Sequence, residues 1–317
     1  ILDDEPARVN ERGGDGQTPL HFARSRAAVD LLLERGADID ARDVDHRSTP
    51  AQWMLERSRG AGRYDIAQYL VTRGASADIF LAAALGLTDR VRTIVESNPA
   101  ALELRTAQGE YGEQPPSSYH MYLWTIGPNL SPIQVAGQFG HENTLAFLRS
   151  VSTPKQRFLT ACAAARTGEA AELLRESPEL MSELTFADHR ALADAAWAPN
   201  PAAVELMMDL GFDPAATGFS GGTALHCAAW EGSAAGVQAI LGHARGRALV
   251  NHRDATFHGT PLGWCWHGSA NCSNPNADYD GVARLLLQAG TIPDPDWESV
   301  PPWLLSLIDE HGGERPQ

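Results

Sequence analysis

The sequence predicts an all-α protein, a solenoid in which one short helical unit is copied along the chain and stacked on itself. Two observations predict this class. One phrase recurs, as DGQTPLHFA at 15–23, SGGTALHCAA at 220–229 and FHGTPLGWCW at 257–266. Each copy precedes an apolar helical stretch with a closing glycine, as VDLLLERGAD at 29–38, GVQAILGHA at 236–244 and VARLLLQAG at 282–290. We therefore expect stacked helix-turn-helix units with hairpin or loop fingers, forming a single solenoid over 1–317.

The recurring phrase resembles the ankyrin repeat, in which Thr-Pro-Leu-His opens a first helix and Leu-Leu-x-x-Gly-Ala-Asp closes a second. The resemblance covers most of the chain, as about eight partly degenerate repeats. Clear repeats open at Thr18, Thr49, Ser131, Thr223 and Thr260. The degenerate repeats, which keep the alanine pair and the second helix without the opening phrase, are 80–96, 158–174 and 191–208.

Each position of the phrase has a physical reason. Thr or Ser before the helix is a natural N-cap, and proline suits the first turn because its missing N–H would be unpaired there. The paired alanines let neighbouring helices approach closely. A glycine after the second helix favours a left-handed stop, which we expect at Gly36, Gly74, Gly211 and Gly290. The resemblance further implies that the histidine of the phrase bridges its own turn to the next repeat, so His21 and His226 are expected to be structural.

Two insertions interrupt the repeats, and long insertions in a solenoid form loops that often lie on the binding side. The first, 106–130, is rich in Pro, Gly and Tyr and ends in SYHMYLWTIG, with Tyr119, His120, Tyr122 and Trp124. We expect an extended, ordered arm that either covers the concave face as a lid or anchors against the convex or end surface. The second, 268–279, is expected to be a loop within the last repeat.

The phrase also sets a register for the concave face. The residue after the histidine position and those three and four further on are expected on the open side, because such residues share a helix face. In this register Trp197, Trp230 and His267 occupy equivalent positions in successive repeats. Cys265 and Trp266 stand where alanines normally do, and are expected to be buried. The other open positions are Trp53, Glu56, Val135, Gln138, Phe139, Asp194, Cys227, Glu231 and Trp264.

An aromatic row beside acidic residues is typical of a peptide or small-molecule pocket; alternatively, the tryptophans only cap the core of a terminal repeat. Acid–base chemistry would use His267, or His120, with Asp194, Glu231 or Asp278. The ligand-binding candidates are Trp197, Trp230, Trp264, Cys227, Phe139, Gln138, His120, Tyr122, Trp124 and Trp53.

The cysteines and histidines suggest two further kinds of site. A Cys227–His267 pair is conceivable as a nucleophile and base, although no orienting acid accompanies it. The spacing C-x-H-x4-C of Cys265, His267 and Cys272 matches no common structural zinc site. The sequence therefore predicts no metal and no cofactor.

Charge and composition exclude other partners. The 25 basic and 40 acidic side chains give a formal charge of 25 − 40 = −15, which repels nucleic acid and anionic lipid. Four cysteines fit reduced thiols, and no apolar run reaches membrane-spanning length, so we expect a cytoplasmic protein. The chain starts at Ile1 without a methionine, so we expect that an upstream segment was removed.

The sequence favours a non-catalytic scaffold that holds a protein or peptide on its concave face, with a basic or neutral partner preferred by its acidic charge. The alternative is an enzyme of lyase, hydrolase or isomerase type, or a small-molecule binder, in the carboxyl-terminal half of that face. In that alternative His267 acts with Asp194 or Glu231.

Overall fold

The computed structural model describes residues 6–55, 63–218, 220–293 and 300–311. The chain divides into two compact units, Ile1–Ser152 and Thr153–Gln317, called here the N-terminal and C-terminal units. The described residues form helices and turns, and their only β contacts are two isolated bridges, Gln114–Ser117 and Thr217–Thr223. The all-α repeat fold is confirmed. A single solenoid over the whole chain stays a prediction.

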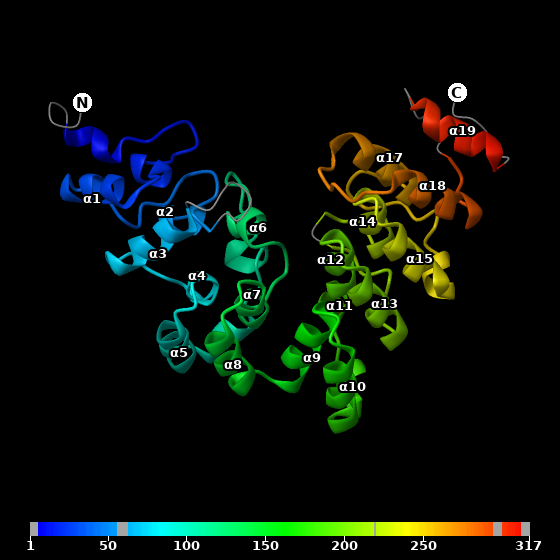
Figure 1. Ribbon diagram of the computed structural model, residues 1–317, viewed down its shortest axis with the longest axis horizontal. Helices are drawn as coiled ribbons and strands as arrows, with labels where there is room; N and C mark the ends of the chain where they lie inside the picture. Colours follow the sequence, from blue (N-terminus) through cyan, green and yellow to red (C-terminus); the bar gives the residue numbers. More distant parts are fainter. Residues whose placement is uncertain (1–5, 56–62, 219, 294–299, 312–317) are drawn as a thin grey trace. The chain divides into compact units, whose positions relative to one another are not determined.

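The N-terminal unit holds four consecutive helix pairs, each with a first and a second helix (Figure 1). The pairs are η2 (Pro19–Phe22) with α1 (Arg26–Glu34), α2 (Pro50–Trp53) with α3 (Tyr64–Thr72), α4 (Ile79–Ala84) with α5 (Thr88–Ser97), and α7 (Pro132–Gln138) with α8 (Glu142–Val151). The short elements between or before them are η1 (Pro6–Asn10), η3 (Pro99–Glu103), η4 (Gly109–Tyr111) and α6 (Tyr122–Thr125).

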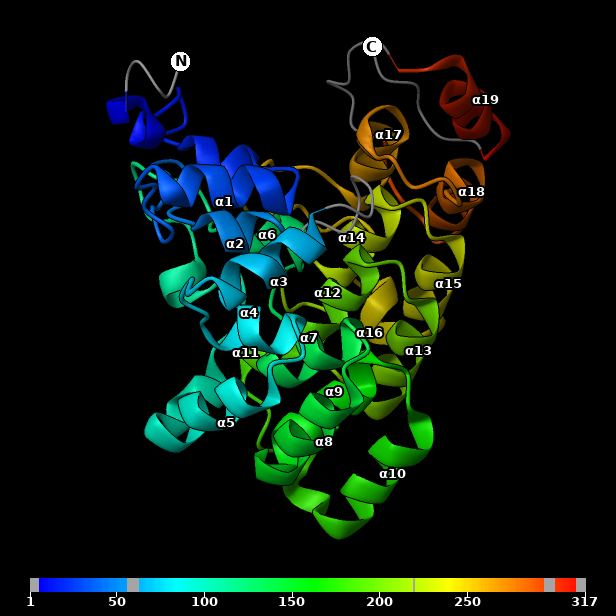
Figure 2. The ribbon, with the colours of Figure 1, turned by 60° about the vertical axis from the view of Figure 1, so that its left-hand side comes forward.

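The C-terminal unit holds four more pairs, which follow one another in both views (Figures 1 and 2). They are α9 (Pro154–Ala163) with α10 (Thr167–Glu176), α12 (Ala191–Trp197) with α13 (Pro201–Leu210), α14 (Ala224–Trp230) with α15 (Ala234–Gly242), and α17 (Pro261–Asn271) with α18 (Tyr279–Gln288). The additional elements are η5 (Pro178–Met181), α11 (Phe186–His189), α16 (Ala244–Arg247) and α19 (Pro302–Glu310). The pairs match the repeats expected from the sequence.

Five first helices, η2, α2, α7, α9 and α14, begin with a capping box, and at α17 the Thr260 hydroxyl accepts the Gly263 N–H as a simple N-cap. At Thr223 the hydroxyl and the His226 imidazole close the box, and at Thr49 the partner is Gln52. The fifth repeat begins earlier than the expected start at residue 158, because α9 begins at Pro154. The structure shows that Thr153 and Gln156 form a full capping box with Pro154 at the first turn, so Thr-Pro-x-Gln replaces Thr-Pro-x-His there.

The two phrase histidines bridge successive repeats, as the resemblance implied. The Thr18 N–H donates to His21 Nδ1 at 3.1 Å, while His21 Nε2 lies 3.1 Å from the Ser48 carbonyl of the next repeat. His226 Nδ1 likewise accepts from the Thr223 N–H at 3.2 Å. Both imidazoles are buried, so their role is structural.

The expected glycine stops are present. Gly36, Gly74, Gly211 and Gly290 have φ of 85°, 105°, 90° and 92°, the left-handed region that lets the chain leave the second helix.

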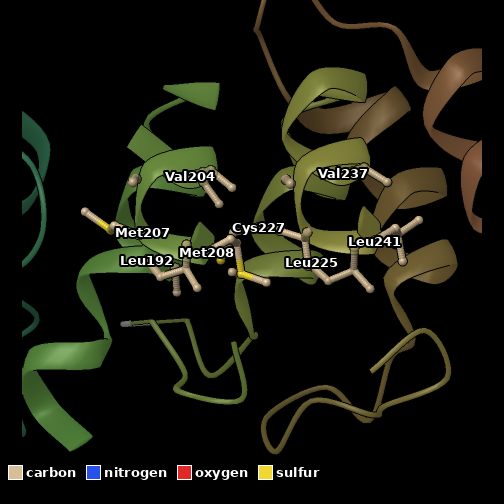
Figure 3. Packing of buried hydrophobic residues seen from close by; sticks show 14 of the residues in the cluster. Leu192, Val204, Met207, Met208, Leu225, Cys227, Val237 and Leu241 are labelled. Atoms are coloured by element: carbon tan, nitrogen blue, oxygen red, sulfur yellow. The ribbon is translucent and has the colours of Figure 1, made fainter. Parts of the chain in front are cut away.

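Each unit has its own apolar core beneath the first helices. In the C-terminal unit, side chains of α12 to α15 interdigitate, among them Leu192, Val204, Leu225 and Val237 (Figure 3). The alanine pairs 82–83, 195–196 and 228–229 are buried as expected, whereas in the fifth repeat Ala163 is partly exposed and Ala164 is exposed. Cys265, at an alanine position, is fully buried, and Trp266 packs partly buried against the same core.

The 106–130 insertion, called the arm, is ordered and packs onto the N-terminal unit. It is not extended as expected, because it contains the short helices η4 and α6. The Ser118 N–H donates to the Asp45 carbonyl at 2.8 Å, and Arg47 donates to the Gly112 carbonyl at 2.9 Å. Both bonds link the arm to the loop that precedes α2. The loop that precedes the first helix of a repeat is called its finger loop. The Tyr122 hydroxyl donates to Asp78, the N-cap of α4, at 2.8 Å. The arm therefore has a fixed place against the first helices α2 and α4.

The second insertion is partly helical, since α17 continues to Asn271 before a loop begins. That loop is tied to the end of α14. Asn274 Nδ2 donates to the Glu231 carbonyl at 2.7 Å, and the Asp278 N–H donates to the Gly232 carbonyl at 2.8 Å.

Candidate functional site

An aromatic row lies in the C-terminal unit, where three successive first helices contribute one ring each. Trp197 ends α12, Trp230 ends α14 and His267 lies in α17. The two indoles are parallel within 6°, with centroids 6.0 Å apart, and the Trp230 and His267 rings are 5.4 Å apart. The indoles are partly exposed and the imidazole is exposed. Repeat spacing therefore brings these residues together as the sequence predicted.

Trp264 supports the row from the core and does not face an open groove. Its ring lies 6.4 Å from Trp197 and 6.2 Å from Trp230, nearly perpendicular to both, and it is 7% exposed. Its Nε1 donates to Asp254 Oδ2 at 2.9 Å. The same carboxylate accepts the N–H groups of Thr256 and Phe257, so it fixes both the finger loop and the indole. The expectation of an open position is wrong for Trp264.

Cys227 is also buried, at 1% exposure, among the core residues of the unit (Figure 3). Its thiol lies 3.9 Å from the Gly222 carbonyl. Burial raises the pKa of this thiol, which keeps it protonated and unsuited to attack as a nucleophile. Val135, at the same register position in another repeat, is fully buried as well. In these repeats the residue directly after the histidine position is buried. At the same position in the first two repeats, Phe22 is exposed and Trp53 is partly exposed.

The two candidate acids have different surroundings. Glu231 is 9% exposed, and burial raises its pKa, partly opposed by a hydrogen bond with the Cys272 thiol. Asp194 is partly exposed and lies near Cys227, whose pKa it helps to raise. Asp278 caps α18 by accepting the Gly281 N–H at 2.9 Å. Acid–base chemistry by His267 with Asp194 or Glu231 stays a prediction.

The described part of the chain contains no group of three or more His, Cys, Asp or Glu side chains arranged to hold a metal. The cysteine spacing that suggested zinc has another explanation. Cys265 is buried and its thiol donates to the Tyr279 carbonyl at 3.5 Å, which fixes the start of α18.

Two aromatic residues of the arm are core residues and not groove residues. His120 is 2% exposed and Tyr122 fully buried, with their rings 4.4 Å apart. Burial, together with the positive charges of Arg47 and Arg42, lowers the pKa of His120 to about 3, so it stays neutral. The expectation that both lie on a binding surface is wrong. They are buried because the arm folds onto Asp78 and carries them inward.

The positions predicted in the fourth repeat lie at the end of α7. Gln138 Nε2 donates to the Ile126 carbonyl of the arm at 2.9 Å, and the Phe139 ring stacks on Tyr64 at 6.1 Å. Both therefore make structural contacts. Glu56, predicted in the second repeat, lies outside the described residues.

Trp53 and Trp124 do come together, through a residue that the sequence analysis missed. The His46 ring lies 5.3 Å from Trp53 and 4.8 Å from Trp124. These rings and Met121 line a hollow of about 420 Å³, called here the arm pocket. One regularity of the sequence could have pointed to the loop that holds His46. Asp43 and Asp254 each stand six residues before a capping Thr, and Asp43 accepts the His46 N–H at 2.8 Å.

The comparisons with known proteins agree with the repeat fold. The family model of the ankyrin repeat matches residues 15–44, which contain the opening phrase at Thr18 and the second helix α1. The chain is an ankyrin-repeat protein.

Two curated relatives match this ankyrin-repeat protein over 91 residues. The chain is 37% identical to "Ankyrin repeat and SAM domain-containing protein 6" of Mus musculus and 36% identical to the protein of that name in Rattus norvegicus. Each match covers 28% of the chain and 10% of the relative, so the chain spans about a tenth of the length of these relatives.

Ankyrin repeats are generally protein-interaction scaffolds, which gives the coarse functional class of this ankyrin-repeat protein. None of its described helices combines the length and the apolar character that crossing a bilayer requires.

Proposed function

We propose that this ankyrin-repeat protein binds a peptide segment of a protein partner through the aromatic row of Trp197, Trp230 and His267. The observation that supports this most directly is the stacking of three rings from three successive repeats, with both indoles partly exposed. Exposed tryptophans contribute large apolar area at low entropic cost, and they are enriched among residues that dominate binding energy.

The row is held in place before any partner arrives. Trp264 packs against both indoles and is itself tied to Asp254, while the Tyr279 hydroxyl donates to the Trp230 carbonyl at 3.0 Å. A surface with fixed rotamers loses little conformational entropy on binding. This supports the row as a preformed binding surface.

Charge indicates the kind of partner. Asp194 lies one turn before Trp197, and Glu231 follows Trp230, so carboxylates flank both indoles. The whole chain carries a formal charge of −15. We therefore propose a neutral or basic peptide, whose cationic groups would be attracted both by the carboxylates and by the faces of the indoles.

A selection from displayed random linear peptides tests this function. We expect Trp197→Ala and Trp230→Ala to weaken the selected peptides about thirtyfold each, corresponding to roughly 2 kcal/mol at a central tryptophan. Phe186→Ala, which removes a 59% exposed aromatic outside the row, is the matched control and should bind as the wild type does. Unchanged affinity in both tryptophan variants, with their helical content preserved, would exclude the row as the binding surface.

The second candidate function is small-molecule binding or acid–base catalysis at the same row. The environment of Glu231 favours it. Burial raises the pKa of this carboxyl, as general acids require. The Cys272 thiol is hydrogen-bonded to it, and the Tyr279 hydroxyl, which donates to the Trp230 carbonyl, lies near enough to feel its charge. Screening of small cationic aromatic compounds by tryptophan fluorescence, compared between wild type and Glu231→Gln, tests it. Quenching that is equal in the two proteins argues against a role for this carboxyl.

The cytoplasm stays a proposal for the location. The thiols of all four cysteines are free, which agrees with a reducing compartment.

A further inference from the structure

The arm pocket is a second candidate surface, in the N-terminal unit, and both the arm and the first two repeats contribute residues to it. One wall is α6 of the arm, with Met121 preceding it and Trp124 within it. The first two repeats contribute other lining residues, among them Phe22 and Trp53. Its volume of about 420 Å³ falls in the range of small-ligand sites, roughly 300–1,000 Å³.

The aromatic wall is rigid. His46 lies between Trp53 and Trp124, and its two ring nitrogens are both engaged: Nδ1 is 2.8 Å from the Tyr119 carbonyl and Nε2 is 3.3 Å from Asp45 Oδ2. Phe22 and Trp124 keep 61% and 55% of their surface exposed, an unusual amount for large apolar side chains. The pocket thus offers flat apolar faces that a planar ring can cover.

The charged groups that line the pocket are basic. Arg24 and Arg63 both line it, and Arg63 is positioned by donating to the His21 carbonyl at 2.5 Å. Two nearby carboxylates are already engaged by the finger loop: Asp43 accepts the N–H groups of His46 and Ser48, and Asp45 pairs with His46. His21, which also lines the pocket, is held neutral because burial lowers its pKa. The pocket therefore favours an anionic group, in contrast to the acidic protein as a whole.

One donor in this wall lacks an acceptor. The indole Nε1 of Trp53 is buried, and none of the described residues provides it with a hydrogen-bond partner. A buried N–H without an acceptor costs free energy, which a bound acceptor would recover. Trp53 thus combines an aromatic face with an unused donor in a wall that also carries two guanidinium groups.

We propose that the arm pocket binds a small aromatic carboxylate. Its ring lies against Trp53, Trp124 and Phe22, and its carboxylate accepts from Arg24 and Arg63 and from Trp53 Nε1. Charge-assisted hydrogen bonds of this kind are the strong ones, and guanidinium matches the two carboxylate oxygens geometrically.

Calorimetric titration of the full chain with 2-naphthoate tests the proposal. We expect one binding site per chain and binding about tenfold weaker for 2-naphthamide, the neutral analogue that cannot form charge-assisted hydrogen bonds. Cyclohexanecarboxylate, which lacks the flat ring, should also bind more weakly. Equal binding of naphthoate and naphthamide would overturn the anionic assignment.

Two variants locate the site. Trp53→Phe keeps an aromatic face and removes the Nε1 donor, and Arg24→Gln removes an exposed cation, so each should weaken 2-naphthoate binding about tenfold. Phe186→Ala in the C-terminal unit, which removes an exposed aromatic side chain outside both proposed sites, is the matched control and should leave the affinity unchanged. Wild-type affinity for 2-naphthoate in both Trp53→Phe and Arg24→Gln would overturn the proposal. The proposal of a small ligand would also be overturned if the protein bound a peptide with a carboxyl-terminal Phe but did not bind 2-naphthoate.

Discussion

At the scale of single residues, the histidine of the opening phrase acts as an internal clamp. In His226, Nδ1 accepts the N–H of Thr223, the N-cap of its own helix, and Nε2 lies 3.1 Å from the His252 carbonyl in the next finger loop. Burial lowers the pKa of this imidazole to about 4, so it is neutral in the folded protein at pH 7. Three other repeats use glutamine at the same position, at Gln52, Gln134 and Gln156. An amide can therefore replace the imidazole in this fold.

This difference predicts a pH-dependent stability that His226→Gln should reduce. The folded pKa of His226, about 4, is below the ordinary value of 6.5, so below pH 6.5 the unfolded chain binds a proton that the folded chain does not. Stability is therefore full above about pH 6.5 and is lost as the pH falls toward 4. At pH 5 the loss from this residue is about 2 kcal/mol.

Urea unfolding at pH 7 and pH 5 measures this effect. The wild type should lose about 2 kcal/mol more between the two pH values than His226→Gln, since all other titrating groups are common to both proteins. His21→Gln should act in the same direction, because burial lowers that pKa too. Identical pH dependence in wild type and His226→Gln would show that the imidazole titrates normally in the folded state.

At the scale of the helix pair, one backbone position joins the first helix to the second. Gly86, Gly140 and Gly232 precede the second helix of their repeats by two residues and have φ of 70°, 76° and 64°. In the fifth repeat Ala165 takes this place with φ of 54°. An L-residue with a Cβ is strained there, by about 1–2 kcal/mol. The backbone of the fifth repeat is therefore strained at Ala165, whereas glycine avoids this strain in the three repeats that contain Gly86, Gly140 and Gly232.

Ala165→Gly is therefore expected to stabilise the protein by up to about 1 kcal/mol, because the relief of strain exceeds the added freedom of glycine in the unfolded chain. Ala164→Gly is the matched control, since Ala164 has φ of −92° and gains nothing from glycine. It should destabilise the protein by about 0.5–1 kcal/mol. Thermal unfolding of the two variants distinguishes them, and destabilisation by Ala165→Gly would contradict the strain argument.

At the scale of the molecule, each unit has its own buried core. One core cluster draws all its buried residues from 9–148, and the other from 158–308. Repeat proteins are stabilised mainly by contacts between adjacent repeats, so a run of four repeats with a complete core can be stable by itself. This agrees with the division at Ser152 and Thr153.

We accordingly expect a fragment of residues 153–317 to fold cooperatively and to bind the same peptides as the full chain. Circular dichroism during urea unfolding measures cooperativity, and the selected peptides measure the aromatic row. A fragment that starts at Ala164 is the control, because it lacks Phe158 and Cys162, both fully buried in this core. If 153–317 unfolds without a cooperative transition, the unit is not independent.

The sequence alone determined the repeat, its caps and its row of aromatic rings. These depend on local chemistry and fixed spacing: a Thr before a helix caps it wherever it stands, and equal spacing places Trp197 beside Trp230. The cap of the fifth repeat could also have been predicted, because Thr153-Pro154-Lys155-Gln156 follows the same pattern as the segments that begin at Thr49 and Ser131.

Only the tertiary structure decided which residues of a first helix reach solvent and where the arm lies. Cys227 and Trp264 share a register position with Trp53, yet the first two are buried and Trp53 is partly exposed, because burial depends on the neighbouring repeat and its finger. The arm folds inward because the Tyr122 hydroxyl donates a hydrogen bond to Asp78, which is 44 residues away in the chain. Such long-range pairings carry no periodic signal, so the arm pocket was visible only in three dimensions.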